Sequence, residues 1–376
     1  MQRKFEEGFL DCFSKLEDPR AKRNRLYSMS EILLVTLCAS ICGAEGWQDV
    51  EDFGNLKIEY LQQYLPYKNG IPSDDTFRRF FRALNPDKFQ ELFREWVKMI
   101  SPNLHDNVIA IDGKSSRRSH DDDKKMLHTI SAYATESRLV LGQEKVSDKS
   151  NEIIAIPQLL KWLDIKGSIV TIDAMGCQYK IANQILEQQG DYIFCLKGNQ
   201  GSLHEDIKLY FSDQELLKKN AKHCDDYDKA HGRIEHRKCS VVSDLDWLKA
   251  GHTEWQSIKS IVCIKSTREI KENISTETRY YISSLAQTPE KTLSSIRSHW
   301  AIENSLHWVL DMSFGDDQSR IRKENAPQVM AVMRHIALNL LQLAKAQMKR
   351  QSVKRLRKMA GWDNHILSYI LQRKFS

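Results

Sequence analysis

Apolar residues in the first hundred positions recur at intervals of three and four. The pattern runs from "SMSEILLVTLCASICG" to "ELFREWVKMI", and Ser28 and Ser30 are suitable N-caps for its first helix. The stretch "PSDDTFRRFFRALNP" predicts another helix, which has Ser73 as its cap and two acids in its first turn and ends before Pro86. We therefore predict an all-helical N-terminal domain over residues 1–100.

The pattern changes at "SPNLHDN", a polar cluster typical of a domain boundary. Three strands are predicted next, in "NVIAIDGK", "LHTISAYAT" and "RLVLGQEKV". A helix, a strand, a helix and a strand follow in "IIAIPQLLKWL", "GSIVTIDAMG", "YKIANQILEQQ" and "DYIFCLKGN". Alternation of this kind predicts an α/β fold, with a mixed sheet and flanking helices.

Strand-like runs interrupt this alternation over about residues 200–285, in "RIEHRKCSVV", "IKSIVCIKS" and "TRYYISSL". We interpret them as a strand-rich insertion within one catalytic domain over 105–345. Helices resume at "TLSSIRSHWAIENSLHWVLDM" and "APQVMAVMRHIALNLLQLAKAQ". A basic C-terminal helical tail is predicted over 346–376, because "KAQMKRQSVKRLRKM" holds seven Lys or Arg and no acid. Such a run favours a polyanionic partner or is a solvated helix face.

The composition indicates the class of protein and its cellular compartment. The 376 residues are 41% hydrophobic and 28% charged, as in ordinary globular proteins. The eight cysteines form no CxxC pair, which favours a reducing, cytoplasmic setting. The start "MQRKFEEGFLDCF" has no apolar signal region, and "ILLVTLCASICG" is shorter than the about 20 residues that span a bilayer. We expect neither export nor membrane insertion.

Two aspartates end buried-looking strands in nearly the same context, "AIDG" at Asp112 and "TIDA" at Asp173. Strand ends are where α/β proteins bind ligands, and two carboxylates brought together there need a cation between them. Oxygen ligands favour Mg²⁺ or Mn²⁺, and two such ions cleave phosphodiesters. The alternative is that each aspartate only forms a turn or caps a helix.

The stretch "HWAIENSLHW" has His299, Glu303 and His307 at helical spacing, on one face. Three roles fit this face. Glu303 completes the carboxylate site, or the three residues form a zinc site, or the histidines are polar neighbours of the packed Trp300 and Trp308.

Three arginines lie on the outer face of the helix predicted after Ser73: Arg78, Arg79 and Arg82. This arrangement fits the second helix of a helix-turn-helix motif that contacts DNA. A solvated arginine face fits equally well.

These residues resemble the DDE-type transposases of bacterial insertion sequences, in particular the H-repeat-associated proteins. The resemblance covers nearly the whole chain. It is carried by "LEDPRAKRNRLYSMSEILLVTLCASICGAEGWQDVEDF", "VIAIDGKSSRRS", "VTIDAMGCQ", "YIFCLKGNQ", "HGRIEHR" and "HWAIENSLHWVLDMSFGDD".

The resemblance implies a ribonuclease H-like catalytic core. Its catalytic, metal-binding acids fall on Asp112, Asp173 and Glu303, with two Mg²⁺ or Mn²⁺ ions. The implied activity is cleavage of element ends and strand transfer into target DNA, by an enzyme that binds double-stranded DNA as a homo-oligomer. DNA contacts are expected from the cationic residues and one histidine: Lys114, Lys197, Arg297, His299, Arg78, Arg79 and Arg82.

One departure concerns the residues around the glutamate. Related transposases often have a tyrosine and an arginine seven and four residues before it and a lysine seven after it, whereas this chain has Ile296, His299 and Leu310. His299 or Arg297 is expected to replace the arginine. Two alternatives stay open: an inactive or repurposed DNA-binding relative, and a nuclease that cuts without joining.

Overall fold

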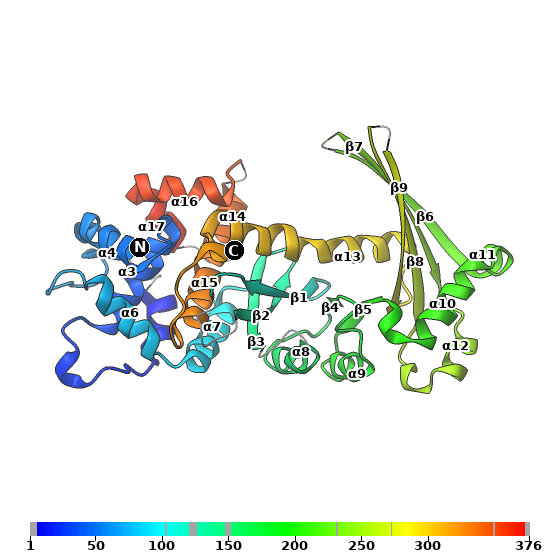
Figure 1. The fold of residues 1–376 in the computed structure, drawn as a ribbon, viewed down its shortest axis with the longest axis horizontal. Helices are drawn as coiled ribbons and strands as arrows, with labels where there is room; N and C mark the ends of the chain where they lie inside the picture. Colours follow the sequence, from blue (N-terminus) through cyan, green and yellow to red (C-terminus); the bar gives the residue numbers. More distant parts are fainter. Residues whose placement is uncertain are drawn as a thin grey trace.

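A computed structural model describes residues 6–101, 104–119, 126–146, 152–230, 232–271, 273–348 and 350–372 (Figure 1). In residues 6–101 every assigned element is helical. These elements are η1 (Glu6–Leu10), α2 (Asp11–Ser14), η2 (Lys22–Asn24), α3 (Met29–Cys42), α4 (Trp47–Leu56), α5 (Ile58–Leu61), α6 (Asp74–Ala83) and α7 (Pro86–Ile100).

Local sequence explains where these helices begin. Ser28 caps α3 in a capping box, because its hydroxyl accepts from Glu31 N while the Glu31 carboxylate accepts from Ser28 N. Ser73 is the N-cap of α6, but its hydroxyl lies 3.2 Å from the Thr76 hydroxyl and bonds no amide of the first turn. Among the described residues, no single helix is long and apolar enough to cross a membrane; α3 and α4 reach that length and composition only as a pair bent by 98°.

Nine strands form one mixed sheet, which confirms the predicted mixed α/β fold. Their order is β3-β2-β1-β4-β5-β9-β8-β7-β6. The strands are β1 (Val108–Ser116), β2 (Leu127–Ala134), β3 (Leu139–Val146), β4 (Ile169–Ile172), β5 (Asp191–Leu196), β6 (Ala221–Ala230), β7 (Arg233–Val242), β8 (Ser260–Ile270) and β9 (Asn273–Ser283). β1, β4 and β5 are parallel, and all other neighbouring pairs are antiparallel.

The predicted insertion extends the sheet. β9 pairs with β5, and β8, β7 and β6 continue outward as long hairpins that project from one end of the molecule (Figure 1). β6 was not predicted, because "AKHCDDYDKA" has no apolar alternation; it is an edge strand with one paired neighbour. The insertion also contains three unpredicted helices, α10 (Ser202–Ser212), α11 (Gln214–Asn220) and α12 (Asp246–Gly251).

The remaining helices cover the sheet and join it to the N-terminal helices. They are α8 (Glu152–Lys161), α9 (Tyr179–Glu187), α13 (Pro289–Ala301), η6 (Ile302–His307), α14 (Trp308–Phe314), α15 (Ala326–Gln347), α16 (Val353–Trp362) and α17 (Asn364–Leu371), with the short turns η4 (Gly198–Gln200), η5 (Thr253–Trp255) and η7 (Asp316–Gln318). α13 lies along the sheet from β1 to β7 and is drawn above β4 and β5 in Figure 1.

α15 is the central helix of the molecule. It packs against α3, α6 and α7 on one side and β3 on the other, and nearly all its residues are buried. The side-chain amide of the buried Asn339 forms two hydrogen bonds with the backbone of Val140 in β3: its Oδ1 accepts from Val140 N at 2.8 Å, and its Nδ2 donates to Val140 O at 2.9 Å. The N-terminal helices therefore share one continuous core with the sheet.

Candidate active site

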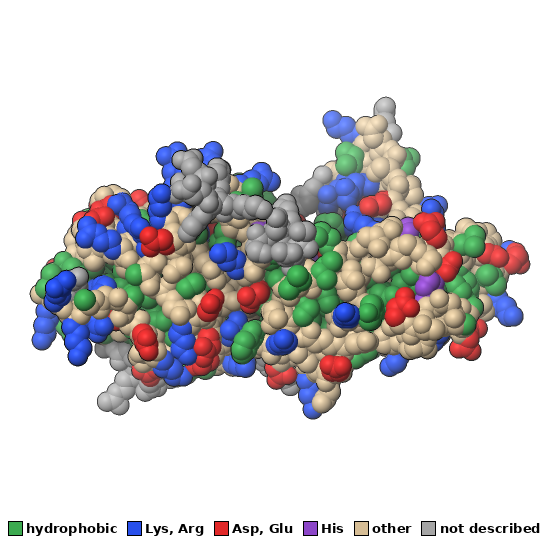
Figure 2. All heavy atoms as spheres, turned by 60° about the horizontal axis from the view of Figure 1, so that its bottom comes forward, with side chains coloured by type: hydrophobic (Ala, Val, Ile, Leu, Met, Phe, Trp, Pro, Cys, Tyr) green, Lys and Arg blue, Asp and Glu red, His purple; other side chains and the backbone are tan. Residues whose placement is uncertain are grey.

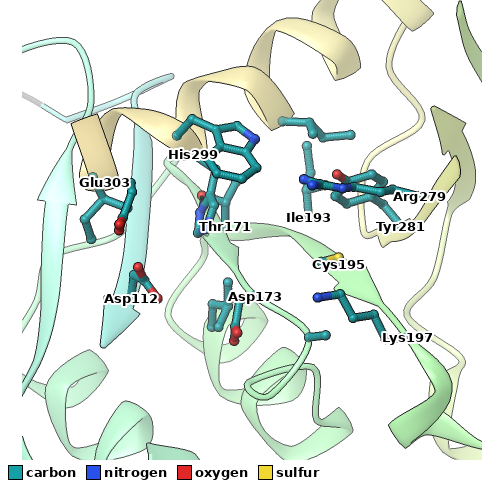
Figure 3. Close-up of a pocket in the computed structure, with 15 residues that line it drawn as sticks. Asp112, Thr171, Asp173, Ile193, Cys195, Lys197, Arg279, Tyr281, His299 and Glu303 are labelled. Carbon is teal, nitrogen blue, oxygen red and sulfur yellow. Dashed lines mark hydrogen bonds between the residues drawn. The ribbon is translucent and has the colours of Figure 1, made fainter. Parts of the chain in front are cut away.

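Two parallel strands bring the sequence-predicted aspartates together. Ile111 of β1 and Ile172 of β4 are paired in register, so the residues that follow them, Asp112 and Asp173, lie side by side. Asp173 comes directly after β4, as predicted, but the prediction that Asp112 ends its strand was wrong, because β1 continues to Ser116 in its pairing with β2. Both line a cavity of about 270 Å³ together with Glu303. Figure 3 shows the carboxylates of Asp112 and Glu303 directed towards each other.

A π-helix positions Glu303. The predicted continuous helix over 292–312 is divided into α13, η6 and α14, and η6 is a π-helical segment that contains Glu303. π-helical turns are rare, and many of those that do occur lie at functional sites. His307 follows Glu303 by four residues, and the two side chains are in contact, with 2.9 Å between Nδ1 and Oε2.

His299 does not join this contact. Its Nδ1 lies 2.9 Å from the Thr171 hydroxyl, and it lines the cavity beside Trp300. The zinc alternative required His299, Glu303 and His307 to converge. In the described residues, two groups have ligand atoms within 4.8 Å of one another: Asp112, Glu303 and His307 form the first, and Asp311, Asp316 and Asp317 form the second. His299 belongs to neither.

Burial and like charge act together on Asp112. Its pKa is raised to about 6, mainly by burial and in part by the carboxylates of Asp173 and Glu303, although His307 and the Gly113 amide act to lower it. Burial also raises the pKa of Asp173, although its Oδ1 accepts from Met175 N and Gly176 N. The hydrogen bond from His307 lowers the pKa of Glu303. Ionisation of Asp112 and Asp173 is therefore unfavourable in the folded chain, and a bound cation would favour it. The cluster is suited to bind a cation for this reason.

Gly113 leaves room for a further acid, Glu152, beside the three acids of the cluster. A Cβ at this position would collide with the Glu152 carboxylate, which lies 2.5 Å from His128 Nε2. The negative charge of Glu152 helps to raise the pKa of Asp173. Sequence reasoning missed Glu152 and His128, because their relation to Asp112 arises from contacts distant in the chain. It named His307 only as a possible zinc ligand with His299 and Glu303, and not as a neighbour of Asp112.

The predicted DNA contacts at the cavity differ in their surroundings. Lys197 follows β5 and its ammonium is directed towards Asp173 in Figure 3. Burial lowers the pKa of His299 to about 4, so this side chain is neutral at pH 7. Arg297 is ion-paired with Asp226 and Asp228 of β6, at 2.8 and 3.6 Å.

Lys114 lies among aspartates. Its ammonium is 2.5 Å from Asp311, 3.5 Å from Asp317 and 3.9 Å from Asp316, and its side chain is 11% exposed. The Asp316 carboxylate also accepts from Arg334, at 2.7 Å. Lys114 therefore neutralises neighbouring carboxylates in this structure.

The arginines of α6 are also paired. Arg78 bonds Asp74 and Asp75, Arg79 bonds Asp75, and Arg82 bonds Glu324 of the segment before α15. Figure 2 shows Lys and Arg side chains, with Asp and Glu among them, at the end of the molecule that the N-terminal helices form.

Sequence reasoning also missed Arg279 and Tyr281 of β9, which line the cavity. The Arg279 guanidinium lies 5.1 Å from the centre of the Trp300 ring and 2.8 Å from Glu277. Both cavity residues lie within the predicted strand "TRYYISSL". No local signal indicates that this strand pairs with β5.

Comparison with known proteins places this geometry in a family. The model of the transposase DDE domain matches residues 103–340, and a model described as DDE_Tnp_1-associated matches residues 10–97. The chain belongs to the DDE transposase family.

The predicted H-repeat-associated subgroup is confirmed by a relative of similar length. The H repeat-associated putative transposase YhhI of Escherichia coli K12 is 42% identical over 371 residues, which cover 96% of this chain and 97% of the relative. A second relative, the inactive transposase YbfQ of the same organism, is 52% identical over 70 residues, 19% of this chain and 83% of YbfQ.

A solved structure of a piggyBac transposase synaptic complex with hairpin DNA aligns with 98% of this DDE transposase and 78% of that chain. Sequence identity is 11% and the TM-score is 0.47, a similarity too low to support an argument about this chain.

Proposed function

We propose that this DDE transposase nicks the ends of an insertion sequence and joins them to target DNA. One observation carries the proposal: Asp112, Asp173 and Glu303 line one cavity, although 61 and 130 residues separate them along the chain. Burial and mutual repulsion of these acids support their use as cation ligands.

We propose a ribonuclease H-like catalytic domain over 105–345, with its insertion at about 200–285. Support comes from the strand order β3-β2-β1-β4-β5 and from the parallel pairing of β1, β4 and β5. In this proposal the helical region 1–100 contributes to DNA binding, and residues 346–376 form a basic helical tail.

The donor set fits divalent cations, since carboxylate oxygens of three acids surround the cavity. Two Mg²⁺ or Mn²⁺ ions would supply activation of the attacking hydroxyl and stabilisation of the leaving oxygen. Asp112 of β1, Asp173 after β4 and Glu303 of η6 would hold these ions.

Basic residues at the cavity bind the DNA backbone in this proposal. Lys197 and Arg279 are the nearest cations of the lining, and Trp300, 47% exposed, offers a ring for stacking on a base. His299 donates a hydrogen bond as a neutral ring. Lys114, Arg297 and the arginines of α6 reach phosphates only if they exchange their present carboxylate partners for DNA.

The partner is double-stranded DNA at the element ends and at the target, bound by a homo-oligomer in the cytoplasm. All eight cysteines are free thiols, which supports a reducing compartment.

The test is to incubate the purified protein with DNA that carries the repeats flanking its own gene, with Mg²⁺ or Mn²⁺, and to map cut and joined ends. We expect nicks at the repeat ends and covalent joining of the freed 3′ ends to a second duplex. Asp173→Asn should give neither product, and the matched variant Asp317→Asn should give both. Nicks without joining would indicate a nuclease.

The second candidate is a DNA-binding relative without catalysis. Similarity to a protein named an inactive transposase, and the absence of the family's usual Tyr, Arg and Lys around Glu303, favour it. Binding of the repeats with no nick in either metal would support this candidate.

A further inference from the structure

His307 faces the two carboxylates that converge from β1 and η6. Its Nδ1 lies 2.9 Å from Glu303 Oε2 and 3.5 Å from Asp112 Oδ2. The imidazole is buried, with 6% of its side chain exposed. Nδ1 thus occupies the third corner of a triangle whose other corners are carboxylate oxygens.

The two sides of this triangle that meet at Nδ1 match the spacing of ligands around one small divalent ion, and all three ligand atoms lie within 4.8 Å of one another. Neighbouring ligands of an octahedral ion with bonds of about 2.1 Å lie about 3.0 Å apart, and tetrahedral ligands lie slightly farther apart. The two distances from Nδ1 fall within or close to this range. A single ion can therefore contact all three atoms with small side-chain adjustments.

The other nitrogen of the ring provides a second observation. His307 Nε2 is buried and has no hydrogen-bond partner in the structure. The polar contacts of this imidazole among the described residues are therefore those to Asp112 and Glu303. His299, eight residues earlier, is bonded to Thr171 instead.

We propose that His307 is a direct ligand, through Nδ1, of the ion held by Asp112 and Glu303, and that it makes this site prefer Mn²⁺ to Mg²⁺. The inference rests on the proposed function, because it concerns the same carboxylates. The preference follows from ligand chemistry: Mg²⁺ selects oxygen ligands, whereas imidazole nitrogen favours transition-metal ions.

The experiment measures Mn²⁺ binding to the full-length protein without DNA. Electron spin-echo spectroscopy of bound Mn²⁺ should show coupling to a ¹⁴N nucleus in the wild type. His307→Asn should abolish this coupling and lower the Mn²⁺ affinity about tenfold or more, while Mg²⁺ affinity changes by less than about threefold. His299→Asn is the matched control, because it removes a neighbouring buried imidazole and should retain both the coupling and the affinity.

Circular dichroism of each variant verifies folding. If His307→Asn does not fold, His307→Gln gives the same comparison. Nitrogen coupling that is absent from the wild type, or that persists in a folded His307 variant, would overturn the inference, since His307 would then only donate a hydrogen bond to Glu303. Nicking assays keep this separate from the proposed function: absence of coupling alongside metal-dependent nicking rejects the ligand alone, and coupling without nicking rejects the catalytic proposal alone.

Discussion

Two groups of three possible metal ligands lie near the carboxyl half of β1. They differ in whether Lys and Arg side chains of the protein neutralise their carboxylates. Asp311, Asp316 and Asp317 surround Lys114, and Arg334 binds Asp316 from α15. Asp112 and Glu303 meet with only His307 between them. The first group is compensated by cations of the chain itself, whereas the second remains short of positive charge.

The pKa values follow this difference. Burial alone raises the pKa of Asp316, but Arg334 and Lys114 outweigh it and lower the pKa below its usual value. Asp112 has its one ion-pair contact in the described part of the chain with His307, at 3.5 Å, and burial still raises its pKa to about 6. Proximity of carboxylates therefore does not identify a metal site; the absence of a compensating cation does.

The largest expected effect is loss of catalysis from the uncompensated group. Glu303→Gln keeps the size of the side chain but removes its charge, so the nicking rate should fall by about a thousandfold or more, roughly 4 kcal/mol of transition-state stabilisation. Thermal stability should stay near the wild-type value. Quantitative nicking assays measure the rate; a Glu303→Gln enzyme within about tenfold of wild type would contradict the site.

Removal of a cation from the compensated group should affect folding. Arg334→Met leaves the buried Asp316 carboxylate without its closest cation, so the free energy of unfolding should fall by about 3–5 kcal/mol. Urea denaturation measures this change, and Arg334→Met with Asp316→Leu should recover part of the loss. Equal stability of Arg334→Met and wild type would show that Lys114 alone compensates the group.

The third prediction concerns Asp112 in protein treated with EDTA. Its pKa is about 6 in the folded chain, above the ordinary value of 3.8, so folded protein binds more protons between these pH values and loses stability as pH rises through them. Asp112→Asn should therefore raise the free energy of unfolding by about 1–3 kcal/mol at pH 7 to 8. This gain should vanish below pH 4.

Asp316→Asn should change the free energy of unfolding in the opposite direction. Because the folded chain lowers the pKa of Asp316, this carboxylate stabilises the fold above its ordinary pKa of 3.8, and the contribution is lost as pH falls through the lower, folded-state value. Asn at this position should destabilise the protein at pH 7. Denaturation curves for both variants at pH 4 and pH 8 give the change in the free energy of unfolding for each. If both variants change stability in the same direction at pH 8, the proposed difference between the two groups of acids is wrong.

The smallest effect extends the comparison to basic residues of α16. Arg357 is buried: its guanidinium lies 4.0 Å from the centre of the Phe314 ring and donates to Ser40 O, and burial lowers its pKa to about 10. Lys354, Arg355 and Lys358 are exposed. Changing these three to Gln should weaken DNA binding equally for all sequences and reduce the slope of log affinity against log salt by about 2–3.

Arg357→Gln is the matched variant. It should lower stability and leave the salt slope unchanged, because its guanidinium is committed to contacts inside the protein. An unchanged slope in the triple variant would assign the exposed charges of α16 to solubility.

Local sequence patterns determined most elements of this protein. The runs at 108–116, 233–242 and 326–347 form the expected strands and helix, and Ser28 caps α3, because propensity and capping depend on residues a few positions apart. β6 was missed because an edge strand of polar residues lacks the period of a buried one. The family resemblance indicated the three acids. The "ID" pattern predicted a strand end correctly at Asp173 but not at Asp112, because β1 continues to Ser116.

Only the tertiary structure decided which charges are compensated. Lys114 meets Asp311 across 197 residues, and His307 approaches Asp112 across 195, distances at which no sequence period carries information. The strand pairing of β1 with β4, the π turn of η6 and the packing of α15 bring these groups together. Electrostatic energy depends on separation in space and on burial, so the sequence supplied the charged residues while the fold determined their roles.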